Sequence, residues 1–581
     1  MPTLKRKSPS TLAQGFSFFK EYLISEEDKL IKWLWLIGAI LCVIAMVGLV
    51  FAFSGWFTVF WAVMEAKAIS PFLMSLAQFG GLVSAYVLVS SLKNYLVGKF
   101  SLSWRNWLTL KFINKLFGSK NNYLELKRTA SELANIEQMI QDDVDKYVKL
   151  TLALSLDFLY SFSILCTFIG SLWILGGTVI FPGYLVLTAI GIALVASVIT
   201  YYIGKQLPKI NKKSEVVEAE FRQDLAQLTQ QSENIAEEHA EEFYKTNLIA
   251  KVDEIKQIEN EKLNVDTKLT AFQSFNLEFN TIIPYLLAVP LYFNNFINLS
   301  QMMQVGFSFG QVSIALNWFV NSYQNISEYK NSINRLTDLI HILESDLNSS
   351  PQNITRKVRE KESIKVKNLT INKPLLKDST PLMRGLTFKL NPGEHVMLQG
   401  RSGFGKSTLF KVISGSWNYG DGKVSIPAHK KLYILPQEPT IPNNTLRVAL
   451  AYPETEQTYD DEQYSEVLKK VGLEKFIPYL NEKKSWGNIL SGGQKQLLSF
   501  ARVLLKKPNW LFWDEGTSAL DEETEERVFN MAKKIENCTI VSIAHRSTLK
   551  KHHRKYLFFK AKGDNCVEIE ETYNAQYENL M

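Results

Sequence analysis

The sequence is poor in cysteine. Its 581 residues include four cysteines, which lie far apart and form no CxxC pair. This spacing argues against a disulfide framework and against a zinc site. The net charge of +7 is spread along the chain, whereas a nucleic-acid binder of this size usually carries a concentrated basic face. No nucleic-acid partner is therefore expected. The N-terminal segment lacks a short apolar core with a cleavage site, so it is not predicted to be a secretory signal peptide.

Charged residues are absent from four long apolar runs. Residues 33–53 and 71–92 are each long enough to cross a bilayer, which takes roughly 20 apolar residues. Residues 158–202 and 279–327 are about twice as long. Glycines and prolines interrupt the first of these long runs, and asparagines interrupt the second. The pattern predicts six transmembrane helices.

The loop charges predict an orientation in the membrane. Basic residues gather in two connecting segments, 99–149 and 205–268, while the other connections carry almost no charge. The positive-inside rule places these two segments and both termini in the cytoplasm. Residues 14–32 mix aromatic and charged side chains at helical spacing. They predict an elbow helix along the inner membrane surface.

The character of the chain changes near residue 363. Short β-rich runs, turns and ordinary charge density replace the apolar stretches, and the polar segment before them is predicted to be a linker. The predicted domains are a 1–32 elbow region, a 33–340 six-helix transmembrane domain, a 341–362 linker and a 363–581 nucleotide-binding domain.

One glycine-rich segment matches the pattern of a phosphate-binding loop. It follows a buried strand predicted over 395–399, and a helix is expected after it. The glycines let backbone amides approach phosphates, Lys406 is expected to reach the β- and γ-phosphates of ATP, and the Ser407 hydroxyl is expected to ligate Mg²⁺. The predicted ATP-binding residues of this loop are Gly400, Arg401, Ser402, Gly403, Phe404, Gly405, Lys406, Ser407 and Thr408.

A second phosphate cradle is predicted at residues 490–494, which read LSGGQ. A serine and two glycines at a helix N-terminus present backbone amides to an anion. The predicted ATP-contacting residues are Ser491, Gly492, Gly493 and Gln494. Farther along, an apolar strand over 510–513 ends in two acids. Asp514 is expected to hold Mg²⁺, and Glu515 is expected to polarise the attacking water as the general base.

These motifs, in this order, resemble those of ABC ATPases. The resemblance implies that Gln437 couples Mg²⁺ and water to the membrane domain, and that His545 senses the γ-phosphate. It also implies that Ser518–Asp521 communicates across a dimer. In this family the LSGGQ segment acts on ATP held by a partner subunit, so the resemblance implies two chains. The predicted catalytic residues are Glu515, His545 and Gln437, and the predicted Mg²⁺ ligands are Ser407, Gln437 and Asp514.

The whole chain resembles an ABC half-transporter of the exporter-type, type IV fold. The implied fold is an α-helical six-span transmembrane domain followed by an α/β P-loop ATPase domain. A narrower resemblance is to the SbmA/BacA-like proteins, their ATPase-fused forms and the peroxisomal subfamily D transporters. It rests on several short segments: 103–109, 135–144, 218–222, 232–236, 283–293 and 416–422.

The sequence departs from these relatives in places. Met139 stands where an arginine is expected, and Gly516 replaces the usual alanine after the catalytic glutamate. Residues 368–374 lack the tyrosine that many ABC ATPases stack on adenine, which puts base selectivity in doubt but leaves the triphosphate chemistry intact.

The narrower resemblance implies a homodimer in a bacterial inner membrane, and import of hydrophilic solutes such as cobalamin or antimicrobial peptides. Export, fatty-acyl-CoA or lipid transport, a heterodimer, and an ATP-gated channel or regulator remain open alternatives. Uncharged polar residues near the fifth and sixth predicted spans favour a large polar cargo, although helix packing and loop solvation explain them equally well. They are Asn294, Asn295, Asn298, Gln301, Gln304 and Gln311.

Overall fold

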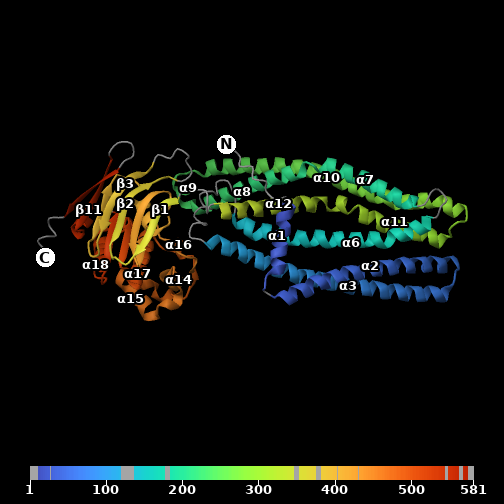
Figure 1. Cartoon of the computed structure of the whole chain (residues 1–581), viewed down its shortest axis with the longest axis horizontal. Helices are drawn as coiled ribbons and strands as arrows, with labels where there is room; N and C mark the ends of the chain where they lie inside the picture. The colour runs from blue at the N-terminus through green and yellow to red at the C-terminus, as the bar shows by residue number, and fades with distance from the viewer. Residues whose placement is uncertain are drawn as a thin grey trace. The chain divides into compact units, whose positions relative to one another are not determined.

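The computed structural model divides the chain into two compact units, 1–346 and 347–581 (Figure 1). The structure describes residues 11–26, 28–118, 136–176, 183–345, 352–373, 381–401, 403–428, 431–543, 547–561 and 567–573. The first unit is helical and the second combines sheets with helices. This order agrees with the predicted fold class.

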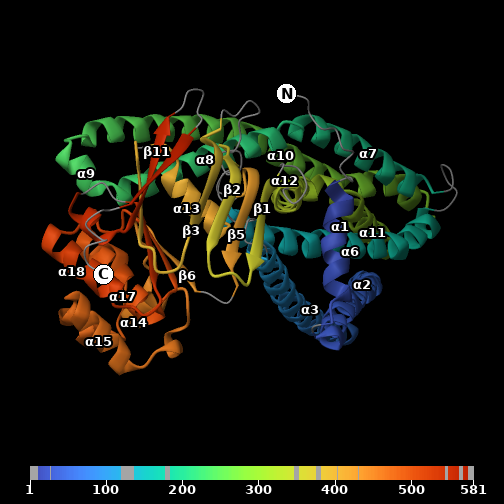
Figure 2. The same ribbon diagram turned by 60° about the vertical axis from the view of Figure 1, so that its left-hand side comes forward.

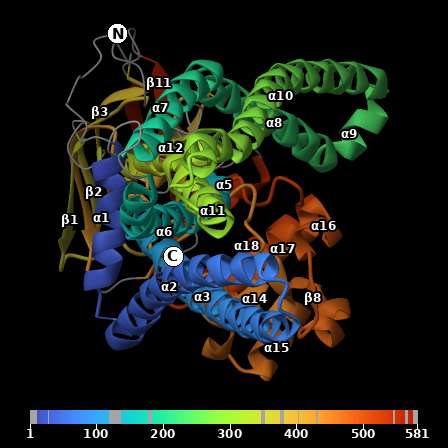
Figure 3. The same ribbon diagram turned by 90° about the vertical axis from the view of Figure 1, so that its right-hand side faces the viewer.

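The first unit consists of long helices. Their bounds are α1 Thr11–Ile24, α2 Lys29–Glu65, α3 Ile69–Phe117, α5 Ile136–Gln138, α6 Val144–Gly176, α7 Tyr184–Gly204, α8 Leu207–Gln230, α9 Ser232–Glu237, α10 Glu241–Phe293, α11 Leu299–Leu316 and α12 Trp318–Ser345. A π-helical turn over Met139–Asp143 joins α5 to α6. Helices α8 and α10 run side by side and project together, with the short α9 connecting their far ends (Figure 3).

Four stretches among the described residues are long and apolar enough to span a membrane, namely 29–65, 69–117, 136–175 and 184–230. Helices α10 and α11 carry the fifth and sixth predicted spans, and they are not among the stretches that are long and apolar enough. Prolines 284 and 290 lie within α10, and glutamines and serines are spread along α11. The six-span arrangement therefore stays a prediction.

The predicted elbow is a helix, but it has a packed side. Phe18 and Tyr22 of α1 are buried, and the Tyr22 ring stacks on Trp104 of α3 with centroids 5.9 Å apart. The hydroxyl of Tyr147 on α6 donates a 2.6 Å hydrogen bond to the Gly15 carbonyl. Helix α1 is therefore fixed to neighbouring helices by an aromatic core, which an amphipathic pattern alone did not predict.

The second unit contains two main sheets. Their strands are β1 Gln352–Arg359, β2 Ile364–Ile371, β3 Met383–Leu390, β4 Val396–Gly400, β5 Gly420–Pro427, β6 Leu432–Leu435, β9 Trp510–Asp514, β10 Thr539–Ile543, β11 Lys555–Ala561 and β12 Val567–Tyr573. The four-stranded sheet has the order β1-β5-β2-β3, and β1, β2 and β5 are seen side by side in Figure 2. The six-stranded sheet has the order β12-β11-β4-β10-β9-β6.

Helices and short elements complete this unit. They are α13 Lys406–Ser414, β7 Asn444–Thr445, α14 Leu446–Ala451, α15 Asp461–Val471, β8 Lys483–Lys484, α16 Trp486–Ile489, α17 Gly492–Lys506 and α18 Glu522–Lys533, with 3₁₀ turns at Glu456–Thr458, Glu474–Tyr479 and Ser547–His552. The strands β4, β9 and β10 are parallel neighbours. Because the carboxyl ends of parallel strands meet at one edge, the loops after β4 and β9 come together there.

The boundary between the two units falls after residue 346, within the predicted linker, 341–362, and regular elements extend into this segment from both ends. Helix α12 continues to Ser345, and β1 pairs in parallel with β5 along its whole length. Strand β1 reads QNITRKVR, so it lacks the apolar alternation by which a half-buried strand is recognised. Its position at the edge of the sheet explains the polar sequence.

Candidate nucleotide site

The phosphate loop connects β4 to α13, and its glycines have backbone angles that other residues rarely adopt. The φ angles of Gly400, Gly403 and Gly405 are 155°, 83° and 81°. A Cβ atom on Gly400 would lie 2.9 Å from the Cβ of Phe559. Glycine is therefore required both by the backbone conformation and by the close approach of β11. Ser402 of this loop lies outside the described residues.

Lys406 is buried within the loop that precedes it. Its Nζ donates hydrogen bonds to the carbonyls of Gly400 at 2.8 Å and Arg401 at 2.9 Å. Burial lowers the pKa of its ammonium group, and the nearby Glu515 and Asp514 oppose this shift. The lysine side chain is thus positioned at the centre of the loop, where the amides of a phosphate cradle converge.

Ser407 and Asp514 come from different elements and meet. The Ser407 hydroxyl donates a 2.8 Å hydrogen bond to Oδ1 of Asp514 at the end of β9. Burial raises the pKa of the Asp514 carboxyl, while the Ser407 hydrogen bond lowers it. A hydroxyl and a carboxylate oxygen at contact distance are ligands that Mg²⁺ accepts, and a bound cation would favour the ionised carboxylate. The residues present therefore fit a magnesium ion.

Glu515 follows Asp514 in a left-handed conformation, with φ 48°. Its backbone amide donates a 3.1 Å hydrogen bond to the carbonyl of Ile543 at the end of β10. A non-glycine residue in this region costs about 1–2 kcal/mol and persists where the surrounding structure holds it. The strain turns the chain at the carboxyl edge of the sheet, directly after Asp514.

Gln437 is exposed in the loop after β6, and a residue that the motifs did not identify holds this loop. Nε2 of the buried Gln496 on α17 donates to the Gln437 carbonyl at 3.3 Å and to Oγ of Ser518 at 3.2 Å. Its Oε1 accepts from the amide of Ala519 at 3.0 Å. Gln496 therefore joins the helix of the LSGGQ segment to two loops of the nucleotide site. One indication of this role is present in the sequence, which is that Gln496 is a polar residue two positions after the LSGGQ segment.

The LSGGQ segment begins α17 with a capping box. The Ser491 hydroxyl accepts from the amide of Gln494, and the Gln494 side chain accepts from the amide of Ser491 at 3.1 Å. A Cβ on Gly493 would lie 3.1 Å from the carbonyl of Ala519, whereas Ser491 and Gly492 are exposed. The capping box rigidifies a helix N-terminus whose serine and first glycine face solvent.

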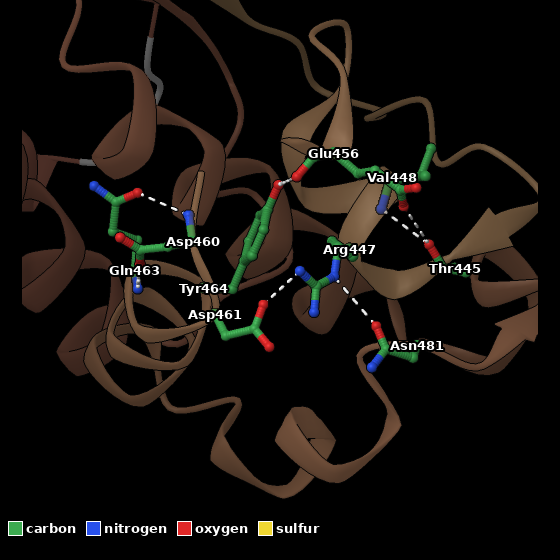
Figure 4. A network of polar contacts seen from close by, with 9 residues as sticks. All are labelled: Thr445, Arg447, Val448, Glu456, Asp460, Asp461, Gln463, Tyr464 and Asn481. Atoms are coloured by element: carbon green, nitrogen blue, oxygen red, sulfur yellow. Dashed lines mark hydrogen bonds and ion pairs between the residues drawn. The ribbon is translucent and has the colours of Figure 1, made fainter. Parts of the chain in front are cut away.

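A polar network holds the helical part around α17 (Figure 4). Arg447 of α14 forms an ion pair with Asp461 of α15, and its Nε donates to Oδ1 of Asn481 at 3.2 Å. The Tyr464 hydroxyl donates to the carbonyl of Glu456 at 2.9 Å. Since α15 and α14 both pack on α17, this network supports the helix that begins at Ser491.

The structure describes one of the two remaining predicted residues, Asp521, but not the other, His545. Asp521 caps α18, because its side chain accepts from the amide of Thr524 at 2.8 Å. His545 lies outside the described residues. The structure therefore brings together Lys406, Ser407 and Asp514, with Glu515 next in sequence, whereas no hydrogen bond between described residues joins 400–408 to 491–494.

Comparisons with known proteins identify relatives for both units of the chain. A family model described as ABC transporter transmembrane region 2 matches residues 21–293, and one described as ABC transporter matches residues 383–518. The inner membrane ABC transporter ATP-binding protein YddA of Escherichia coli is 30% identical over 85% of this chain and 88% of its own length. The ABC transporter D family member 2, chloroplastic, of Arabidopsis thaliana is 24% identical over 83% and 76%.

A solved structure shares the fold. The structure of a bacterial Atm1-family ABC exporter with ATP bound matches with a TM-score of 0.78, covering 94% of this chain and 96% of that one at 18% identity. At this identity the match shows the fold alone. With the phosphate loop, the contact between Ser407 and Asp514 and the relatives together, the chain belongs to the ABC transporter family, as an ATP-hydrolysing membrane transporter.

Proposed function

We propose that the chain is a homodimeric half-transporter with two ATP sites, each built from both chains. Lys406 of one chain binds the β- and γ-phosphates, and Ser491 and Gly493 of the partner chain close over the same nucleotide. The observation that carries this is that the two phosphate cradles, 400–408 and 491–494, lie on different elements and share no hydrogen bond between described residues. A half-transporter of this fold assembles as a dimer, and one sequence with every motif is sufficient for two equal sites.

The chemistry follows from the residues at the carboxyl edge of the six-stranded sheet. Ser407, Asp514 and Gln437 hold Mg²⁺, which offsets charge on the phosphate oxygens when bound. Glu515 accepts a proton from the attacking water, and His545 contacts the γ-phosphate. Gln496 positions the Gln437 loop. Loss of the γ-phosphate removes charge-assisted contacts across the dimer, and segments 97–149 and 205–268 carry the movement to the membrane helices.

The role of Glu515 is tested by Glu515→Gln in the full-length protein reconstituted in liposomes. This variant keeps the shape of the side chain but removes the base, so we expect ATP binding without turnover and a trapped closed dimer. A matched control is Glu522→Gln on α18, which makes the same chemical change at an exposed acid. Turnover at the wild-type rate by Glu515→Gln would refute the assignment.

The two-chain site is tested by complementation. Lys406→Ala and Ser491→Arg each inactivate both sites of a homodimer. A mixed dimer of the two variants has one intact site, which combines Lys406 from one chain with Ser491 from the other. Recovery of ATPase activity on co-expression and purification through two different tags supports the dimer, and mixed dimers as inactive as either parent refute it.

The cargo is proposed from the narrower resemblance, which favours import of hydrophilic solutes such as cobalamin or antimicrobial peptides. Proteoliposomes with labelled cobalamin, peptide or fatty acyl-CoA, with ATP inside or outside, would identify both the cargo class and the direction. Concentration of cobalamin or peptide on the side predicted for the cytoplasm supports import. Acyl-CoA movement or export would replace this proposal with one of its alternatives, and dissipative flow only would indicate an ATP-gated channel.

The proposed topology has six spans, with the ATPase unit and both termini in the cytoplasm of a bacterial inner membrane. Support comes from the loop charges and from the relative named as an inner membrane protein. The topology is tested with single cysteines introduced into the α2–α3 and α10–α11 connections. An impermeant maleimide applied to intact cells should label them. Labelling of cysteines introduced at 205–268 instead would indicate the opposite orientation.

A further inference from the structure

The first unit contains a cavity of about 240 Å³ among helices α2, α10, α11 and α12. Its walls are uncharged: none of the described residues that line it is acidic or basic. One wall is made of amides and a hydroxyl, and it includes Asn276, Asn280, Ser313 and Asn317. The cavity lies outside the nucleotide site, and the predicted polar residues from 294 to 311 do not line it.

The three asparagines form a hydrogen-bonded relay with a fixed direction. Nδ2 of Asn317 donates to the carbonyl of Ser313 at 2.8 Å. Its Oδ1 then accepts from Nδ2 of Asn276 at 3.0 Å, and Oδ1 of Asn276 accepts from Nδ2 of Asn280 at 3.1 Å. Since a carbonyl can only accept, the bond to Ser313 sets the orientation of all three amides.

The relay leaves one acceptor unused. Oδ1 of Asn280 is buried and has no hydrogen-bond partner among the described residues, and the whole side chain is 7% exposed. Buried polar atoms in folded proteins are nearly always satisfied, so each exception requires an explanation. Polar contacts between membrane helices stabilise packing, which accounts for Asn276 and Asn317. It does not account for the free oxygen of Asn280.

The rest of the cavity offers apolar contact. The rings of Phe57 on α2 and Phe307 on α11 lie 5.6 Å apart between centroids. Tyr285 of α10 packs against Gly306, where a Cβ would lie 2.6 Å from the tyrosine hydroxyl. This close packing keeps α10 and α11 together beside the amide wall. A ligand group would therefore meet hydrogen-bond acceptors on one side and aromatic surface on the other.

We propose that this cavity is a cargo subsite for an uncharged group carrying N–H donors, with Oδ1 of Asn280 as its acceptor. The inference rests on the proposed transport function and adds the chemistry of the cargo to it. The volume of about 240 Å³ lies below the roughly 300–1,000 Å³ of pockets that enclose a whole drug-sized ligand, so the cavity holds one group of a larger cargo. Carboxamide groups of a corrinoid and the main chain of a peptide both fit. The phosphates of an acyl-CoA would bring unpaired charge into an uncharged site.

The test is calorimetric titration of the full-length protein in lipid nanodiscs without ATP. The probes are cyanocobalamin, an acetyl- and amide-capped peptide of glycine and alanine, and palmitoyl-CoA. We expect at least one of the two neutral probes to bind, which also distinguishes the corrinoid from the peptide source. Asn280→Leu should weaken that binding about tenfold, as expected for loss of one buried hydrogen bond.

Three further variants separate binding from packing. Asn280→Asp in its protonated form keeps an acceptor oxygen and an O–H donor toward Asn276, so at mildly acidic pH it should bind more tightly than Asn280→Leu. Gly310→Leu should block binding by filling the cavity, because a Cβ at Gly310 meets nothing within 4 Å. Asn260→Leu makes the matched change at an exposed position of α10, and it should bind like wild type.

The proposal is overturned if neither neutral probe binds the wild-type protein, or if binding is unchanged in both Asn280→Leu and Gly310→Leu. It is also overturned if Asn280→Asp and Asn280→Leu weaken binding equally at mildly acidic pH, because an acceptor oxygen at position 280 would then make no difference. Failure of the transport function itself would look different. The probe would bind with the expected variant pattern, but ATP would move no cargo into proteoliposomes.

Discussion

The ATPase unit should lose stability in mild acid because it contains a histidine that is held neutral. His553 is fully buried. Its Nδ1 donates to the carbonyl of Leu549 at 2.8 Å, so Nδ1 carries the proton, and Nε2 accepts from the Ser542 hydroxyl at 2.6 Å. Desolvation lowers the pKa of His553 to about 3, although the hydrogen bond to Leu549 opposes this shift.

The direction of the pH effect follows from proton binding. The unfolded histidine, with a pKa of about 6.5, binds a proton on acidification before the folded one does. The free energy of unfolding is therefore highest, with respect to this histidine, above a pH of about 6.5. It decreases as the pH falls toward the folded pKa. For a folded pKa of about 3, the loss at pH 5 is about 2 kcal/mol from this residue. That is a large share of the roughly 5–15 kcal/mol by which domains are stable.

The assay is thermal unfolding of the detergent-solubilised full-length protein at about pH 7.5 and about pH 5, followed by near-UV circular dichroism and residual ATPase activity. His553→Asn keeps a donor near the Leu549 carbonyl and does not titrate. The variant should start less stable than the wild type and lose less stability between the two pH values. Equal losses in both proteins would show that protonation of His553 does not control acid sensitivity.

Two further predictions concern contacts of the ATPase unit. Gln496→Leu keeps the volume of the side chain but releases the loops at Gln437 and Ser518, so ATPase activity should fall at least about tenfold while fluorescent-nucleotide affinity changes little. Gly420→Ala should destabilise the unit by more than about 3 kcal/mol, measured as a lower unfolding temperature, because its Cβ would overlap the carbonyl of Thr370. Unchanged turnover in the first variant, or unchanged unfolding in the second, would contradict these contacts.

The meeting of Ser407 and Asp514 in the candidate nucleotide site could be predicted because it depends on short contiguous motifs. A phosphate loop needs glycines at fixed positions next to Lys406 and Ser407, and a strand ending in acids places Asp514 opposite them. Gln496 could not be identified in this way. Its role depends on the packing of α17 against two distant loops, and one buried glutamine on a helix has no distinctive sequence pattern.

The polar residues near the fifth and sixth predicted spans show the same limit. Asn298 and Gln301 form the capping box of α11, and the Asn294 side chain donates to the carbonyl of Pro290 at 2.7 Å. These three residues complete helix ends, a local role that differs from both the polar-cargo interpretation and the alternatives of helix packing and loop solvation. The amides that line the cavity come from 273–280 and 317–321. They are separated by about 40 positions and become neighbours only when α10 packs beside α11 and α12.

Gly516 shows how a departure from the family pattern follows from packing elsewhere in the same strand. Trp513 is stacked between Phe500 and Phe529, with centroid distances of 5.7 and 5.3 Å. A Cβ on Gly516 would lie 3.1 Å from Nε1 of Trp513 and 3.1 Å from Cγ of Leu435. The indole therefore occupies the space that an alanine methyl group would need. The backbone amide of Glu515 donates a hydrogen bond to the carbonyl of Ile543, a contact that does not involve the side chain of residue 516. The glycine, directly after the Glu515 position, therefore accommodates the large Trp513 side chain in β9.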